Sequence, residues 1–188
     1  MEYLEPFNSY IDMENWKLEP EGEGIIRKLS DMDDMYYDQE AAKESLEEDP
    51  IIYEFYTVKV PETASNLLHC ISTINPGKIG DEYFMTKGHF HEVEDTAEIY
   101  LTLSGEGQMV METPEGEASV IEMKKGSISY IPPYWAHRTV NTGDKPLVFF
   151  AVYRGDAGHD YGSIEEKSMA KIVVEEGGEV SIKDNPNY

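Results

Sequence analysis

The sequence contains one cysteine and few basic residues. Cys70 has no second cysteine with which to form an internal disulfide, so a disulfide scaffold and a thiolate-ligated zinc cluster are excluded. Only 15 Lys and Arg residues stand against 38 Asp and Glu residues, giving a formal net charge of −23. Because such a surface repels polyanions, we expect no nucleic-acid partner and no anionic-membrane partner.

The sequence also lacks long apolar runs and the features of a secretory signal. No stretch approaches the roughly 20 apolar residues that span a bilayer. The first thirty residues lack a basic start, an apolar segment and a small-residue cleavage site. We therefore expect a soluble, cytoplasmic protein with no membrane partner.

The chain is expected to form a single domain over residues 1–188, in three consecutive parts. Residues 1–50 are acid-rich and irregular and predict an N-terminal arm, with a short helix over residues 38–48. Residues 51–155 predict a barrel core that holds the functional site. Residues 156–188 predict a C-terminal loop with further strands.

Apolar and polar residues alternate in short runs from residue 51 onward, which is typical of β-strands. Turn residues separate the runs, and this pattern favours an all-β antiparallel barrel or sandwich. The predicted strands cover residues 51–60, 66–74, 98–105, 108–113, 118–123, 127–132, 137–141, 147–153, 171–176 and 179–182.

Three histidines and a glutamate are spaced as metal ligands. His89 and His91 are two residues apart, so on a strand both imidazoles point to one face. Glu98 opens the following strand and can face them, and His137 opens a later strand and supplies a third imidazole. This ligand set suits one divalent ion, Fe(II), Mn(II), Ni(II) or Zn(II), and does not choose among them.

The two segments that carry these ligands resemble the two motifs of the cupin family. Gly126, Pro132, His137 and Asn141 have the spacing of the second motif, and the first motif is followed from His89 to Gly105. Two departures are a longer gap between His91 and Glu98, and Tyr134 where glycine is usual. The resemblance implies a double-stranded β-helix, or jelly-roll, barrel. Cupins have many functions, so the fold does not decide the activity.

Longer phrases resemble the archaeal cupin-type glucose-6-phosphate isomerases. They are TKGHFH (86–91), YLTLSGEG (100–107), PPYWAHRTVN (132–141) and DAGHDYG (156–162). This resemblance implies interconversion of glucose 6-phosphate and fructose 6-phosphate in glycolysis and gluconeogenesis by a homodimer, with iron in the cupin site. The alternatives are a cupin dioxygenase, another sugar-modifying cupin, a sugar-binding module without activity, and a structural barrel.

Glu98 is the candidate catalytic residue, either as a base that moves a proton or as a ligand beside a direct hydride shift. Thr86, Lys87 and Gly88 precede the first histidine and offer a hydroxyl, an ammonium and an open backbone amide for a phosphate. The resemblance adds Tyr53, Ser72, Tyr153 and Tyr161 to the substrate pocket. Further candidates are His159, in ring opening or as a loop residue, and Arg138, at the substrate or in a surface ion pair.

Overall fold

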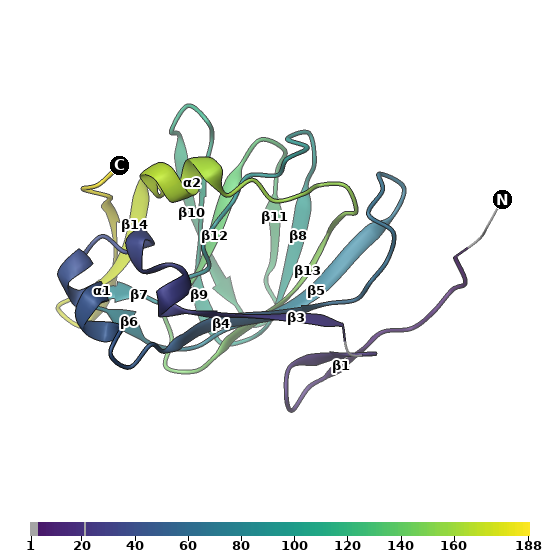
Figure 1. Ribbon diagram of the computed structural model, residues 1–188, viewed down its shortest axis with the longest axis horizontal. Coiled ribbons are helices and arrows are strands. Elements are labelled where there is room, and N and C mark those ends of the chain that lie inside the picture. Colours follow the sequence, from purple (N-terminus) through teal and green to yellow (C-terminus); the bar gives the residue numbers. More distant parts are fainter. Residues whose placement is uncertain (1–3, 21) are drawn as a thin grey trace.

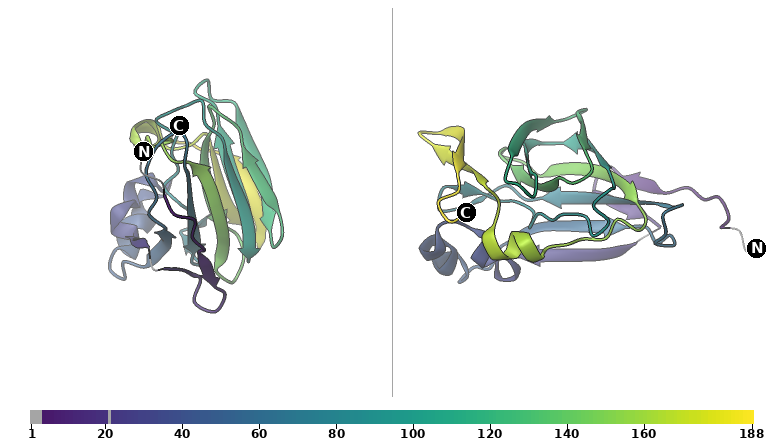
Figure 2. Two further views of the ribbon diagram at one scale, coloured as in Figure 1. Left: turned by 90° about the vertical axis from the view of Figure 1, so that its right-hand side faces the viewer. Right: turned by 90° about the horizontal axis from the view of Figure 1, so that it is seen from above.

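The structure is a computed structural model that describes residues 4–20 and 22–188. Residues 1–3 and 21 of the predicted arm lie outside this described part. Two antiparallel sheets face each other in the body of the molecule, as Figures 1 and 2 show, and both contribute side chains to one buried apolar cluster. The all-β jelly-roll fold class is confirmed.

A six-stranded sheet forms the larger wall, with the order β11-β8-β13-β5-β4-β3. Its strands are β3 (Glu23–Lys28), β4 (Ile51–Thr57), β5 (Leu67–Ile74), β8 (Glu98–Ser104), β11 (Ile128–Ile131) and β13 (Leu147–Arg154). The facing sheet has three strands, in the order β10-β9-β12. They are β9 (Glu106–Glu112), β10 (Ala118–Lys124) and β12 (Ala136–Asn141).

A smaller four-stranded sheet, ordered β15-β14-β7-β6, closes one end of the body. It contains β6 (Lys78–Ile79), β7 (Glu82–Tyr83), β14 (Lys171–Glu176) and β15 (Glu179–Asp184). The strands predicted at 171–176 and 179–182 are confirmed here. The two-residue strands β6 and β7 were not predicted because they are too short to show alternation.

The N-terminal arm is more ordered than its composition indicated. Strands β1 (Tyr10–Asp12) and β2 (Lys17–Glu19) form a hairpin, and Leu18 packs with Val58, Ile71 and Val148 in a small apolar cluster of its own. Strand β3 pairs along β4 at the edge of the large sheet. Its sequence EGIIRK shows no clean alternation, since an edge strand is open to solvent and tolerates charge.

Short helices complete the structure. Helix α1 (Gln39–Ser45) lies within the predicted range 38–48, and the Asp38 side chain caps it by accepting hydrogen bonds from the backbone amides of Glu40 and Ala41. Two 3₁₀ turns, η1 (Leu29–Asp31) and η2 (Asp33–Met35), precede it. Helix α2 (Gly162–Lys167) crosses above β3 and β4 in Figure 1 and was not predicted, because it is short and has no capping side chain.

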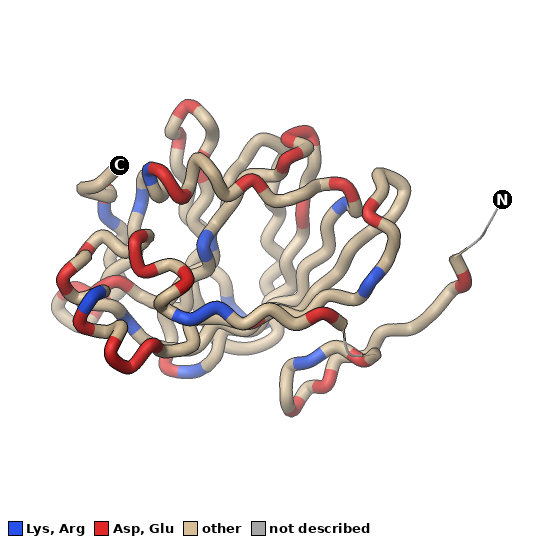
Figure 3. The backbone as a smooth tube through the Cα atoms, viewed as in Figure 1, with Lys and Arg blue, Asp and Glu red and all other residues tan. Residues whose placement is uncertain are grey.

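Figure 3 shows the charge distribution. Acidic residues are spread over loops and the first helices, and basic residues are scattered between them. Among the described residues, no helix is long and apolar enough to cross a membrane.

Candidate active site

The inner face of the six-stranded sheet forms one wall of a pocket. Residues directly opposite each other on antiparallel strands share a face. The register pairs Tyr153 with Glu98, and Phe149 with Ser72, on this wall. The lining residues are Tyr53, Phe55, Cys70, Ser72, Thr86, Lys87, Gly88, His89, Glu98, Tyr100, His137, Phe149, Tyr153, His159 and Tyr161.

The four predicted metal ligands converge at one end of this pocket. The candidate ligand atoms of His89, His91, Glu98 and His137 all lie within 4.8 Å of one another. His89 and His137 are held side by side by a backbone bridge, in which each amide donates to the other residue's carbonyl, at 3.3 and 3.1 Å. Glu98 is the first residue of β8, and its side chain is 5% exposed.

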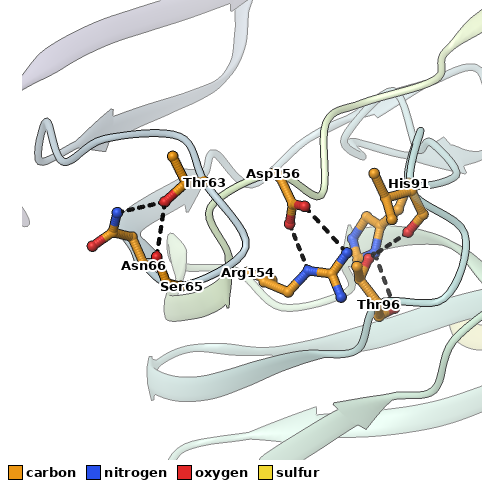
Figure 4. Close-up of polar contacts among 8 residues, drawn as sticks. Thr63, Ser65, Asn66, His91, Thr96, Arg154 and Asp156 are labelled. Atoms are coloured by element: carbon orange, nitrogen blue, oxygen red, sulfur yellow. Dashed lines mark hydrogen bonds and ion pairs between the residues drawn. The ribbon is translucent and has the colours of Figure 1, made fainter.

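The His91 ring is fixed by Thr96, a residue that the sequence reasoning missed. The Thr96 hydroxyl donates to the carbonyl of Val93 at 2.8 Å, so its oxygen is left to accept a hydrogen bond from Nδ1–H of His91, at 2.6 Å (Figure 4). The Thr96 carbonyl lies 3.1 Å from the same nitrogen. With the proton on Nδ1, the Nε2 atom of His91 carries a free lone pair that faces Glu98 at 3.3 Å.

Three other buried imidazole nitrogens lack hydrogen-bond partners among the described residues, and one of them is Nδ1 of His137. His89 Nε2 has no hydrogen-bond partner among the described residues. His137 Nε2 lies 3.1 Å from an oxygen of Glu98, yet it too makes no hydrogen bond within the described part of the chain. Buried nitrogens left without partners are costly unless another group binds them. This donor set therefore fits a divalent cation.

Electrostatics favour the protonation states that a metal requires. Burial, reinforced by the neighbouring imidazoles of His137 and His159, holds the pKa of His89 well below its usual range. Burial raises the pKa of Glu98, but its contacts with His137 and His91 outweigh burial, and the net pKa is lowered. The site thus offers a neutral imidazole and a carboxylate at neutral pH.

Residues 86–88 form the pocket wall next to the ligands. The Thr86 hydroxyl accepts a hydrogen bond from the Thr139 amide at 3.0 Å, and Lys87 Nζ pairs with Glu165 of α2 at 3.3 Å. Gly88 has φ +79°, and a Cβ there would lie 3.2 Å from Cβ of Arg138, so a side chain would be strained by the backbone conformation and crowded by Arg138. The backbone can therefore approach a ligand closely at this point.

A family model described as "Glucose-6-phosphate isomerase (GPI)" matches residues 26–188. The chain belongs to this family. The "Glucose-6-phosphate isomerase" of Thermococcus gammatolerans is 52% identical over 188 residues, covering 100% of this chain and 99% of that relative. The protein of that name from Pyrococcus furiosus is 49% identical over 187 residues, covering 99% and 98%.

More distant similarities extend to a bacterial relative and to solved structures. A "Putative glucose-6-phosphate isomerase 1" of Rhizobium meliloti is 34% identical over 190 residues, covering 98% of this chain and 88% of the relative. Oxalate decarboxylase of Bacillus subtilis, solved at pH 4.6, superposes with a TM-score of 0.45 at 24% identity, over 57% of this chain and 26% of that chain.

The structure brings the remaining predicted site residues to the pocket, with one exception. Tyr53, Ser72, Tyr153, His159 and Tyr161 line the pocket. Arg138 does not line it. Its side chain is almost fully buried behind residues 86–88, so it belongs to no surface ion pair. Its position directly after His137 gave no signal of this burial.

Phenol groups around the pocket remain protonated at neutral pH. Burial, followed by the proximity of Tyr161, raises the pKa of Tyr53 to about 12, and burial also raises the pKa of Tyr153 and Tyr161. Each can act as a hydrogen-bond donor. Cys70 also lines the pocket, but burial raises the pKa of its thiol to about 12, so it is an unreactive part of the wall.

Proposed function

We propose that the protein is a metal-dependent aldose–ketose isomerase that interconverts glucose 6-phosphate and fructose 6-phosphate. The observation that carries this proposal is one pocket that joins a His₃Glu ligand cluster to a loop of hydroxyl, ammonium and open amide groups. The full-length relatives named glucose-6-phosphate isomerase support the same substrate pair.

One divalent ion per subunit would be held by His89, His91, Glu98 and His137, and we propose Fe(II), with Mn(II), Ni(II) and Zn(II) as other ions that this donor set can hold. When bound, such an ion would polarise a substrate carbonyl and stabilise negative charge on the neighbouring hydroxyl oxygen. The chain's own contribution is to keep His89 neutral, because burial lowers its pKa, and to orient the ligand rings, as Thr96 does for His91.

Glu98 is proposed as the base that moves the carbon-bound proton. In the direction of glucose 6-phosphate, its carboxylate accepts the proton from C1 of fructose 6-phosphate and returns it to C2, while the hydroxyl proton passes from O1 to O2. Its lowered pKa keeps it ionised and able to accept. The alternative, a hydride shift from C1 to C2, leaves Glu98 as a ligand alone.

The other polar groups bind and orient the substrate. Residues 86–88 are proposed to hold the phosphate, and the protonated Tyr53, Tyr153 and Tyr161 to donate hydrogen bonds to phosphate and sugar oxygens, with Ser72 beside them. Burial lowers the pKa of His159, so its neutral ring can both donate and accept a proton during ring opening. Phe55 and Phe149 exclude water from the wall between these groups.

A homodimer is proposed for the assembled enzyme. The segment before β1 runs away from the barrel in Figure 1, and it carries the exposed apolar side chains Leu4 and Phe7. The edge strand β3 adds Ile26, which is 50% exposed. Light scattering at micromolar concentration should give twice the chain mass, and a monomer would contradict this proposal.

The cellular setting is proposed to be sugar-phosphate metabolism in the cytoplasm, in glycolysis and gluconeogenesis. The free, buried Cys70 suits a reducing compartment, where structural disulfides are rare.

The decisive experiment is conversion of fructose 6-phosphate to glucose 6-phosphate before and after EDTA, with Fe(II), Mn(II), Ni(II) and Zn(II) restored one at a time. Chelation should abolish turnover, and one of these ions should restore it. Carrying out the reaction in D₂O separates the two routes. Proton transfer through Glu98 places deuterium at C2 of glucose 6-phosphate, whereas a hydride shift places none there. Absence of turnover with every metal would overturn the proposed function.

A further inference from the structure

Strand β3 places a cationic side chain, Arg27, beside Tyr53 of the pocket wall. Arg27 lies directly opposite Tyr53 in the β3–β4 register, and cross-strand partners share a face of the sheet. Tyr53 lines the pocket, so Arg27 belongs to the inner face as well. Figure 1 shows β3 next to β4, with α2 above both.

Arg27 is half-buried, and one nitrogen of its guanidinium group is buried without a hydrogen-bond partner among the described residues. Its Nε atom is inaccessible to solvent and has no hydrogen-bond partner among residues 4–20 and 22–188. Buried guanidinium nitrogens are normally hydrogen-bonded, so such an atom marks a position where another acceptor is expected. Its charge also reaches the phenols, since Arg27 lowers the pKa of both Tyr53 and Tyr161, against the larger opposite effect of burial.

The charge balance at this end of the pocket requires a second cation. The chain carries a net charge of −23, and the ammonium of Lys87 is already paired with Glu165 at 3.3 Å. A phosphate dianion beside Lys87 and Glu165 would meet little net positive charge. A planar guanidinium is suited to bind two phosphate oxygens together.

We propose that Arg27 is a substrate-specificity residue that binds the phosphate of the sugar phosphate together with residues 86–88. Free inorganic phosphate should be bound by the same group. This inference rests on the proposed function for its substrate, but phosphate binding can be measured without turnover.

The test compares Arg27→Gln with Lys28→Gln in the metal-loaded full-length protein. Lys28 is the next residue on β3, half-exposed and paired with Asp49 at 3.4 Å, so its substitution removes the same charge outside the pocket. Binding of inorganic phosphate is measured by calorimetry, and KM and kcat are measured with fructose 6-phosphate.

Loss of one charge-assisted contact is expected to weaken phosphate binding by about 10- to 100-fold in R27Q. KM should rise by a similar factor, and kcat should stay within about twofold because Arg27 is not one of the candidate ligands. K28Q should match the wild type. R27K keeps the positive charge but not the planar guanidinium group, so its phosphate affinity should lie between those of R27Q and K28Q. The same measurement on R27K tests the proposal if R27Q does not fold.

Three results would overturn the assignment of Arg27. The first is that R27Q and R27K bind phosphate as tightly as the wild type. The second is that K28Q loses as much phosphate affinity as R27Q. The third is that R27Q has a lower melting temperature but unchanged phosphate affinity. If the wild type binds phosphate in an Arg27-dependent way but shows no isomerase activity with any metal, the Arg27 site stands and the proposed function fails.

Discussion

Arg138 donates two hydrogen bonds to the backbone carbonyl of Lys87, from Nε at 3.1 Å and from Nη2 at 2.7 Å. Its third contact, from Nη1 to the Ser168 hydroxyl at 3.3 Å, reaches the residue that follows α2. A single buried guanidinium thus ties the loop of residues 86–88 to the segment that covers the pocket. Arg138 orients that loop rather than binding substrate.

Replacing Arg138 with Met should destabilise the protein and make the loop of residues 86–88 less ordered. The Lys87 carbonyl would lose both of its hydrogen bonds from Arg138, and Glu82 and Glu112 would lose a nearby buried cation, so we expect a loss of stability of about 1–3 kcal/mol. We expect a lower melting temperature and weaker phosphate binding. Arg138→Lys, which keeps the charge, should recover part of the stability but not the two contacts to the Lys87 carbonyl. Unchanged phosphate affinity in both variants would refute the orienting role.

Replacing Thr96 with Val should weaken metal binding about 10- to 100-fold, because the oxygen that fixes the His91 ring is removed while the shape is kept. Thr96→Ser retains the hydroxyl and should bind metal nearly as the wild type does. Competition with a chromogenic chelator measures both affinities. Equal affinity in the two variants would show that the ring is oriented by other contacts.

Metal loading should raise the melting temperature of the wild type. The unpartnered nitrogens of His89 and His137 gain a partner only in the loaded protein. At a free metal concentration of 100 times Kd, the stabilisation is about 2.7 kcal/mol. Calorimetric scans with and without EDTA check this, and the His89→Ala variant should show no difference between the two scans. A shift of equal size in that variant would indicate metal bound elsewhere.

Glu82 should make the protein less stable as the pH rises from about 4.5 to 7. Burial raises the pKa of this carboxyl to about 7, opposed by the Tyr37 amide and by Arg138. Within that window the folded state keeps a proton that the unfolded state has released, so this group's contribution falls with rising pH, by about 1.4 kcal/mol for each pH unit.

The Glu82→Gln variant tests this origin. The substituted amide keeps an oxygen for the backbone N–H of Tyr37, which in the wild type donates to the Glu82 carboxylate at 2.9 Å. Relative to the wild type, the variant should gain stability steadily between pH 5 and 7 in denaturant titrations. A parallel pH dependence of both proteins would assign the effect to other groups, such as Asp81 and Tyr36, which also face Glu82.

The proposed role of Lys87 in phosphate binding makes Glu165 a competitor for its ammonium group, so removal of Glu165 should tighten anion binding. The Lys87–Glu165 pair is partly exposed, and such pairs contribute at most about 1 kcal/mol, so Glu165→Gln should lower the phosphate dissociation constant by about two- to fivefold. Glu166→Gln removes the same charge from a neighbouring exposed position of α2 and should have a smaller effect. Equal effects of the two substitutions would indicate that phosphate binding depends on the total negative charge of α2 and not on the Lys87–Glu165 pair.

The strands and the ligand cluster could be predicted because their signals are local. Alternation of apolar and polar residues predicted the strands of the core. Two sequence motifs predicted that His89, His91, Glu98 and His137 lie together. Arg27 and Thr96 could not be found in this way. Arg27 matters through its partner Tyr53 on another strand, and Thr96 through a ring that folds back onto it, so both depend on register and loop closure.

The environment of Arg138 was predicted wrongly from the sequence. Its charge and its place beside His137 indicated a surface or substrate contact, because isolated arginines are mostly exposed. Burial was decided by packing against Gly88 and by the carbonyl of Lys87, neither of which is visible in the order of residues. The segment after β13 is fixed similarly, by the Arg154–Asp156 pair drawn in Figure 4.

The pocket is composite along the chain. Residues 51–155 supply all four candidate ligands, whereas Arg27 comes from before that core, and His159, Tyr161 and Glu165 come from after it. The core therefore carries all four candidate ligands and the proposed phosphate contacts of residues 86–88, whereas the two flanking stretches add further side chains to the same site. Changes in the two flanking stretches can therefore alter part of the pocket wall while all four candidate ligands stay in place, so substrate contacts and metal ligands can diverge separately during evolution.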